Sequence, residues 1–128
     1  CNFARSHQDS YLNVTMINSS DYHDYVIKDG VFVGEFEQMY RNVPDPWCCV
    51  SQANALKNSV LCSVVDFLKT DVRVALDVGC GLGALTNRLS HTLPNAQWHG
   101  CDVSVTAISQ SVERYPHMRI NQCRSLFT

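Results

Sequence analysis

The sequence lacks an apolar run long enough to cross a membrane, and it has no large excess of charge of one sign. Its 128 residues include 10 basic and 12 acidic side chains, a formal net charge of −2, and the basic residues are dispersed. A spanning helix needs about 20 apolar residues in a row, and nucleic-acid-binding domains usually gather their basic residues in one patch. We therefore expect no membrane and no nucleic-acid partner, while the oligomeric state stays open.

The chain also lacks the Cys-x-x-Cys spacing that is typical of zinc sites. It has seven cysteines, an odd number, and Cys48 and Cys49 are adjacent, which argues against a disulfide framework. Several cysteines fall in expected apolar elements, where a free thiol behaves as a small hydrophobic group. We therefore expect reduced cysteines, no metal site and a cytoplasmic location.

We expect that both ends of the chain are cut, either because the protein is processed or because the sequence is part of a longer one. The first residue is Cys1 rather than Met, and Thr128 follows directly after an expected strand. The length fits one domain. We divide it into an N-terminal arm and cap segment, residues 1–50, and the first half of an α/β domain, residues 51–128, which we expect to be truncated.

The most informative stretch runs from Val72 to Arg88 and has the order strand, glycine turn, helix. Apolar residues alternate along the expected strand (Val72, Val74, Leu76, Val78), and alternate glycines follow it (Gly79, Gly81, Gly83). Leucines at helical spacing come next (Leu85, Leu89, Leu93), and Pro94 ends the run. This order is typical of the phosphate- or nucleoside-binding opening of a Rossmann-like fold.

The remaining elements extend this pattern. We expect a strand at 97–102, a helix at 104–115 and a strand at 118–123. Because parallel strands are joined by right-handed crossovers, the predicted strand order is 3-2-1. The fold class is thus α/β, a Rossmann-like parallel sheet with helices on both faces, of which only the ligand-binding half is present. A helix at 53–68 should pack on the sheet beside the first strand.

The nature of the ligand depends on Asp77. The glycine spacing also fits a relaxed dinucleotide fingerprint, so a nicotinamide-dependent oxidoreductase is one hypothesis. However, a dinucleotide places its pyrophosphate at the helix N-terminus, where the carboxylate of Asp77 would repel it. A ligand with a cationic amino group and no phosphate suits this position better.

S-adenosylmethionine has those properties, and residues 76–83 (Leu-Asp-Val-Gly-Cys-Gly-Leu-Gly) resemble the first motif of class I S-adenosylmethionine-dependent methyltransferases. The resemblance implies this cofactor and a loop, including Cys80, that surrounds it. It implies that Asp77 and the backbone of Gly79 lie near the methionine amino group. It also implies that Gly81 and Gly83 pass beneath the methionine and ribose. No catalytic residue can be assigned.

Asp102 supports the same interpretation from a second position. It ends the next expected strand, nineteen residues after Gly83, where a βαβ nucleoside site binds ribose hydroxyls. The resemblance implies that Asp102 holds the ribose and that Val103 packs on the adenine. The alternative is that Asp102 only stabilises the start of the next helix. Beyond the third strand, Arg124 stands where the family usually has an acid.

The cap segment contains a less specific resemblance. Asp29-Gly30 between β-branched residues predicts a hairpin, and the helix Glu35–Tyr40 is followed by Asp45-Pro46-Trp47. This arrangement resembles the N-terminal region of small-molecule methyltransferases related to the nodulation-factor N-methyltransferases. The resemblance implies that Trp47 covers the cofactor and that the acceptor is a small molecule such as an amine or amino sugar. Two alternatives stay open: Tyr40 and Trp47 only pack the arm onto the core, or the chain is a non-catalytic nucleoside-binding fragment.

Overall fold

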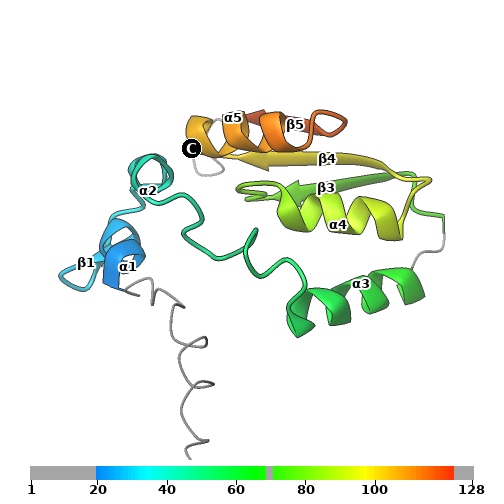
Figure 1. The fold of residues 1–128 in the computed structure, drawn as a ribbon, viewed down its shortest axis with the longest axis horizontal. Coiled ribbons are helices and arrows are strands. Elements are labelled where there is room, and N and C mark those ends of the chain that lie inside the picture. The colour runs from blue at the N-terminus through cyan, green and yellow to red at the C-terminus, as the bar shows by residue number, and fades with distance from the viewer. Residues whose placement is uncertain (1–19, 69–70, 123–128) are drawn as a thin grey trace, which may run out of the picture.

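A computed structural model describes residues 20–68 and 71–122 (Figure 1). Its helices are α1 (Ser20–Val26), α2 (Phe36–Asn42), α3 (Leu56–Leu68), α4 (Ala84–Thr92) and α5 (Val105–Arg114). Its strands are β1 (Ile27–Lys28), β2 (Val31–Phe32), β3 (Val74–Val78), β4 (Gln97–Asp102) and β5 (Arg119–Gln122). The arm predicted at residues 1–20 lies outside the described residues except for its last residue, and so does the unusual position Arg124.

The main sheet has three parallel strands in the order β3-β4-β5. This confirms the predicted 3-2-1 order and the partial Rossmann-like fold. The register places Asp77, Gly100 and Ile120 side by side on the three strands. Within the described part of the chain β3 has a partner on one side only, so its other edge is open.

Helices α4 and α5 pack on the face of the sheet that carries Asp77, Gly100 and Ile120. Ile120 is 7% exposed and forms a buried cluster with Cys80 and Met118 beneath α5. On the opposite face, alternate residues of β3 are largely exposed: Val74 (62%), Leu76 (60%) and Val78 (52%). The alternation predicted from the sequence is therefore present, but no described helix covers its apolar side.

The cap segment forms a hairpin between two short helices. Ile27 pairs with Phe32, and the turn residues Asp29 and Gly30 have φ angles of 51° and 77°, as the Asp-Gly pair predicts. Helix α1 was not predicted, because its polar sequence shows no helical period. Helix α2 buries Met39 and Tyr40 against α5 and the glycine loop, and thereby joins the cap to the core.

Helix α3 does not lie where the sequence predicted. It packs beside α4 instead of on the sheet, and none of its residues is buried. Arg88 of α4 holds it by donating from Nη1 to the Ala53 carbonyl oxygen (2.7 Å), from Nη2 to Ser59 Oγ (2.9 Å) and from Nε to Cys62 Sγ (3.3 Å). This polar attachment explains the displacement, because the guanidinium fixes the start of α3 against α4.

The cysteines only partly match the prediction of a reduced set. Cys48, Cys49, Cys62 and Cys80 are free, whereas Cys101 is disulfide-bonded. The prediction of reduced cysteines is therefore wrong at Cys101, whose sulfur forms a disulfide bond.

Over residues 20–68 and 71–122, no helix is long and apolar enough to span a bilayer. No group of metal-binding side chains is found in the same ranges.

Candidate functional site

A hollow of about 530 Å³ lies at the carboxyl ends of β3 and β4, where α/β sheets of this kind bind ligands. Both the core and the cap contribute to its wall. The core supplies Val78, Gly79, Cys80, Gly81, Asp102 and Val103, and the cap side supplies Phe36, Tyr40, Trp47 and Cys49. Asp102 is the one carboxylate in this lining, so the hollow is mainly apolar with a single anionic group.

The glycine loop is fixed to the end of β4 by its backbone. The amide groups of Gly79 and Cys80 both donate to the carbonyl oxygen of Cys101, at 2.8 and 3.0 Å. Gly81 has a φ of 51°, and a Cβ atom there would lie 2.5 Å from the hydroxyl oxygen of Tyr40. Both the backbone conformation and the close approach of Tyr40 therefore require glycine at this position.

Asp102 links this loop to the next helix. It is 7% exposed, and its Oδ2 accepts from the Gly81 amide (2.8 Å) while Oδ1 accepts from the Ser104 amide (2.9 Å). Each carboxylate oxygen can accept about two hydrogen bonds, so each has capacity left toward the hollow. The two alternatives from the sequence are thus compatible, because Asp102 supports the start of α5 and also lines the hollow; its binding to a ribose stays a prediction.

Asp77 does not line the hollow. Its Oδ2 accepts a short hydrogen bond from the hydroxyl of Thr86, a fully buried residue in the first turn of α4. The negative charge thus lies against the N-terminal end of α4, the position at which a dinucleotide would place its pyrophosphate. This placement disfavours a phosphate ligand there, as the sequence suggested.

Gly83 does not line the hollow either, and its position is explained by close packing within the fold. It has a φ of 74°, and a Cβ atom there would collide with the Ser111 hydroxyl of α5 and lie 3.2 Å from Ile120 Cδ1. The third glycine therefore allows the loop, α5 and β5 to pack closely. Of the eight residues predicted for the site, the structure brings six to the hollow (Trp47, Gly79, Cys80, Gly81, Asp102, Val103) and places Asp77 and Gly83 outside its lining.

The cap side of the hollow is aromatic. Tyr40 is 5% exposed, and burial together with the nearby Asp102 carboxylate raises the pKa of its hydroxyl, which therefore stays protonated. Trp47 is 39% exposed at the rim. Its loop is held by Asp45, whose carboxylate accepts from the amides of Val50 (3.1 Å) and Ser51 (2.8 Å). The aspartate of the Asp-Pro-Trp motif thus fixes the conformation of the loop by hydrogen bonds to its backbone.

The two thiols of the hollow are neutral at ordinary pH. Burial, followed by the carboxylates of Asp102 and Asp77, raises the pKa of Cys80 to about 12. Burial and the nearby Asp45 carboxylate also raise the pKa of Cys49. Since the thiolate is the reactive form of cysteine, neither residue is suited to act as a nucleophile here.

Sequence reasoning missed several residues of the site. Phe36 and Tyr40 stood on one predicted helix face, which was a usable signal, but nothing in the sequence paired them with Gly81 or Asp102. Glu37 was also missed, because its partners on α5 lie almost 70 residues further along the chain. Contacts of that separation have no local sequence signal.

Comparison with known proteins agrees with this geometry. A family model described as a methyltransferase domain matches residues 75–126, about two-fifths of the chain. This stretch is therefore similar in sequence to a methyltransferase domain. It contains all of β3 except its first residue, the glycine loop and Asp102, so the methyltransferase resemblance seen in the sequence is confirmed. The narrower relation to nodulation-factor enzymes stays a prediction.

Solved structures similar to this chain include the plantazolicin methyltransferase BpumL in complex with SAH, at 23% identity and a TM-score of 0.43. The complex of BpumL with a monoazolic desmethylPZN analogue and SAH has the same identity and TM-score. Each match covers 70% of this chain but only 37% and 38% of the respective enzyme. No curated protein sequence matches this chain significantly.

Proposed function

We propose that this chain carries the cofactor-binding part of an S-adenosylmethionine-dependent methyltransferase, with the cofactor in the hollow between the glycine loop and the cap. The observation that carries this proposal is the position of Asp102. It is a buried carboxylate at the end of β4 that holds the glycine loop and still has acceptor capacity toward the hollow. Such an acid can bind the two hydroxyls of a ribose.

The other lining residues suit the remaining parts of the cofactor. Val103 is 43% exposed beside Asp102 and offers an apolar surface to the adenine. Phe36, Tyr40 and Trp47 form an aromatic wall opposite the glycine loop, and aromatic faces attract cations such as a sulfonium. The donor supplies the methyl group, while this chain binds and orients it and excludes water.

Asp77 acts in this proposal through charge rather than direct contact. Its carboxylate, held by Thr86 against the first turn of α4, favours the ammonium group of the methionine part and opposes a pyrophosphate. Gly79, which lines the hollow next to it, offers its backbone to the same end of the cofactor.

We further propose a small-molecule acceptor, such as an amine or amino sugar, on the basis of the cap sequence resemblance. The division into a cap, residues 1–50, and a core, residues 51–128, belongs to the same proposal.

A binding comparison tests the proposal directly. We expect S-adenosylhomocysteine to raise the melting temperature of the chain and to bind measurably in calorimetry, whereas NADH at the same concentration does neither. The control is Asp102→Asn, which should weaken the binding of S-adenosylhomocysteine. Binding of NADH in preference to S-adenosylhomocysteine would instead establish the dinucleotide alternative, and binding of neither ligand would remove the proposed cofactor site.

A further inference from the structure

Besides packing through the buried Met39 and Tyr40, helix α2 is attached to the start of α5 by the carboxylate of Glu37. Glu37 Oε2 accepts from the Ser104 hydroxyl (2.7 Å) and from the Thr106 amide (3.1 Å), and Glu37 Oε1 accepts from the Thr106 hydroxyl (2.7 Å). Figure 1 shows α2 beside the end of the sheet at which α5 begins. A carboxylate in this position is favoured by the free amide groups and positive dipole of the helix N-terminus.

The contact continues directly into the proposed cofactor site. Ser104, which donates its hydroxyl to Glu37, donates its backbone amide to Asp102 (2.9 Å). Asp102 in turn accepts from the Gly81 amide (2.8 Å). Three hydrogen bonds therefore join the cap helix to the acid and the glycine loop of the hollow.

Helix α2 also contacts the glycine loop directly, through the side chain of Tyr40. The Tyr40 side chain lies one turn along α2 from Glu37, is buried, and has its hydroxyl directly over Gly81. Glu37, Ser104, Asp102, Gly81 and Tyr40 thus form a closed ring of contacts around one wall of the hollow. If Glu37 releases α5, the packing of Tyr40 against Leu82 is left to hold Tyr40 near the glycine loop, without the hydrogen bonds that fix the start of α5.

We propose that Glu37 is a positioning residue for the cofactor: by holding α2 on the start of α5, it orients Asp102 and keeps Tyr40 over Gly81. This inference rests on the proposed function. Glu37 itself does not line the hollow, so it acts through Ser104 and Tyr40 and not by contact with the cofactor.

Binding of S-adenosylhomocysteine to matched variants tests the inference. Glu37→Ala should weaken binding about tenfold or more, because a charge-assisted set of hydrogen bonds is lost. Alanine is the best helix former, so this change does not weaken α2 itself. Glu37→Gln should restore binding to within about threefold of the parent, because its amide oxygen can still accept from α5. Thr106→Val should also weaken the binding of S-adenosylhomocysteine, and Thr106→Ser should bind it about as tightly as the parent does.

Arg41→Ala is the matched control. Arg41 also contacts Glu37, at 2.9 Å, but its side chain is 62% exposed and it does not reach α5. Exposed pairs of this kind contribute little, so we expect binding within about twofold of the parent. Equal losses in Arg41→Ala and Glu37→Ala would show that any change on the outer face of α2 matters, and would overturn the inference.

Hydrogen exchange separates failure of this inference from failure of the proposed function. Without any ligand, Glu37→Ala should speed the exchange of the amides of residues 39–43, while Arg41→Ala should not. If the parent does not bind S-adenosylhomocysteine, the proposed function fails whatever α2 does. If the parent binds and Glu37→Ala binds equally well with unchanged exchange, the positioning role fails while the proposed function stands.

Discussion

The residues on the two sides of β3 differ sharply in their burial and in their hydrogen bonds. Toward β4 and α5, residues are buried and hydrogen-bonded, as Asp102 and Ser104 are, and the cap adds Tyr40. On the other side, α3 has no buried residue, and Val74 and Leu76 of β3 are more than half exposed. The region toward β4 and α5 is therefore well packed, whereas α3 and the open face of β3 present apolar surface that no described residue covers.

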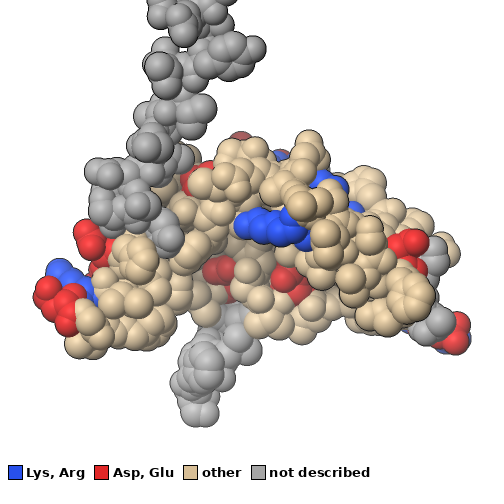
Figure 2. All heavy atoms as spheres, turned by 90° about the horizontal axis from the view of Figure 1, so that it is seen from below, with Lys and Arg blue, Asp and Glu red and all other residues tan. Residues whose placement is uncertain are grey.

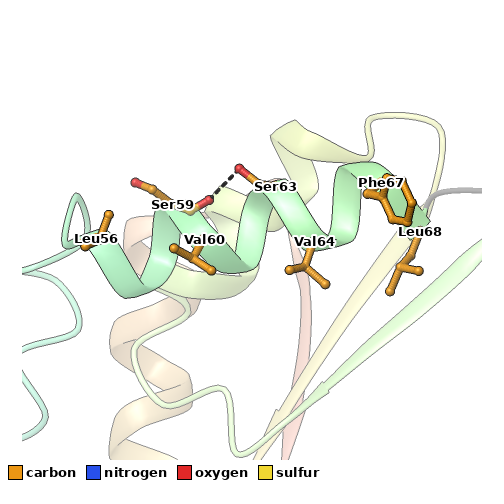
Figure 3. A pocket seen from close by; sticks show the side chains of 7 residues that line it. All are labelled: Leu56, Ser59, Val60, Ser63, Val64, Phe67 and Leu68. Carbon is orange, nitrogen blue, oxygen red and sulfur yellow. Dashed lines mark hydrogen bonds between the residues drawn. The ribbon is translucent and has the colours of Figure 1, made fainter.

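The apolar surface is continuous along α3. The view from below the molecule shows a mainly uncharged surface (Figure 2). Val60, Val64 and Leu68 project from one side of this helix, and Phe67 is 85% exposed (Figure 3). Exposed apolar surfaces and open strand edges favour association. We therefore expect that ligand binding and self-association can be changed independently in this chain.

The largest expected effect is at Asp102. Asp102→Ala removes the acceptor for the Gly81 and Ser104 amides as well as the proposed ribose contacts, so the free energy of binding S-adenosylhomocysteine should fall by about 3–6 kcal/mol, at about 1.5–3 per charged hydrogen bond. Asp102→Asn should lose less, because one acceptor oxygen remains. Calorimetry measures both. Binding of Asp102→Ala within threefold of the parent would contradict the placement of the ribose.

The next effect is at Gly81. Gly81→Ala introduces a Cβ atom 2.5 Å from the Tyr40 hydroxyl oxygen in a left-handed backbone, so Tyr40 must move and binding should weaken at least tenfold. Gly30→Ala is the control, because Gly30 has a φ of 77°, a Cβ atom there would meet no atom within 4 Å, and the residue lies outside the hollow. Both variants carry similar backbone strain, about 1–2 kcal/mol. Equal binding by the two would show that Tyr40 does not matter.

A smaller effect concerns pH. Although burial acts in the opposite direction, hydrogen bonds from Ser104, Thr106 and Arg41 lower the pKa of Glu37 from 4.5 to about 2. A lowered pKa contributes stability that is present above pH 4.5 and is lost as the pH falls toward 2. The Glu37 side chain is about a third exposed, so we expect only about 1–2 kcal/mol after screening. Urea unfolding of the parent and Glu37→Gln should therefore give free energies that converge between pH 4.5 and 2.5; a constant difference would refute this.

The smallest effect on stability is expected from a substitution on α3. The same substitution should change self-association. Val64→Lys should change the free energy of unfolding by about 0.5 kcal/mol or less, because Val64 is 45% exposed. It should nevertheless reduce self-association of the 128-residue chain in sedimentation. Val112→Lys on α5, where the valine is 41% exposed, is the control and should leave association unchanged. A parent chain that sediments as a monomer would remove the basis of this comparison.

The ligand-binding side could largely be predicted from the sequence, because its signals are local. The strand, the glycines and the acid that ends β4 follow one another within 31 residues, and each has a backbone reason for its position. Asp77 was placed correctly at the strand end, but its bond to Thr86 depends on how α4 turns. The link from Glu37 to Thr106 and the position of α3 depend on packing between distant segments, and therefore could not be predicted.

The attachment of α3 through Arg88 has a consequence for the order in which the molecule opens. A helix that buries no side chain and is held by the hydrogen bonds of one guanidinium forms a separate unfolding unit, because little free energy opposes its release. The amides of α3 should therefore exchange with solvent through sub-global openings while β4 and α5 stay protected. Arg88, though remote from the hollow, sets the free energy of that first opening.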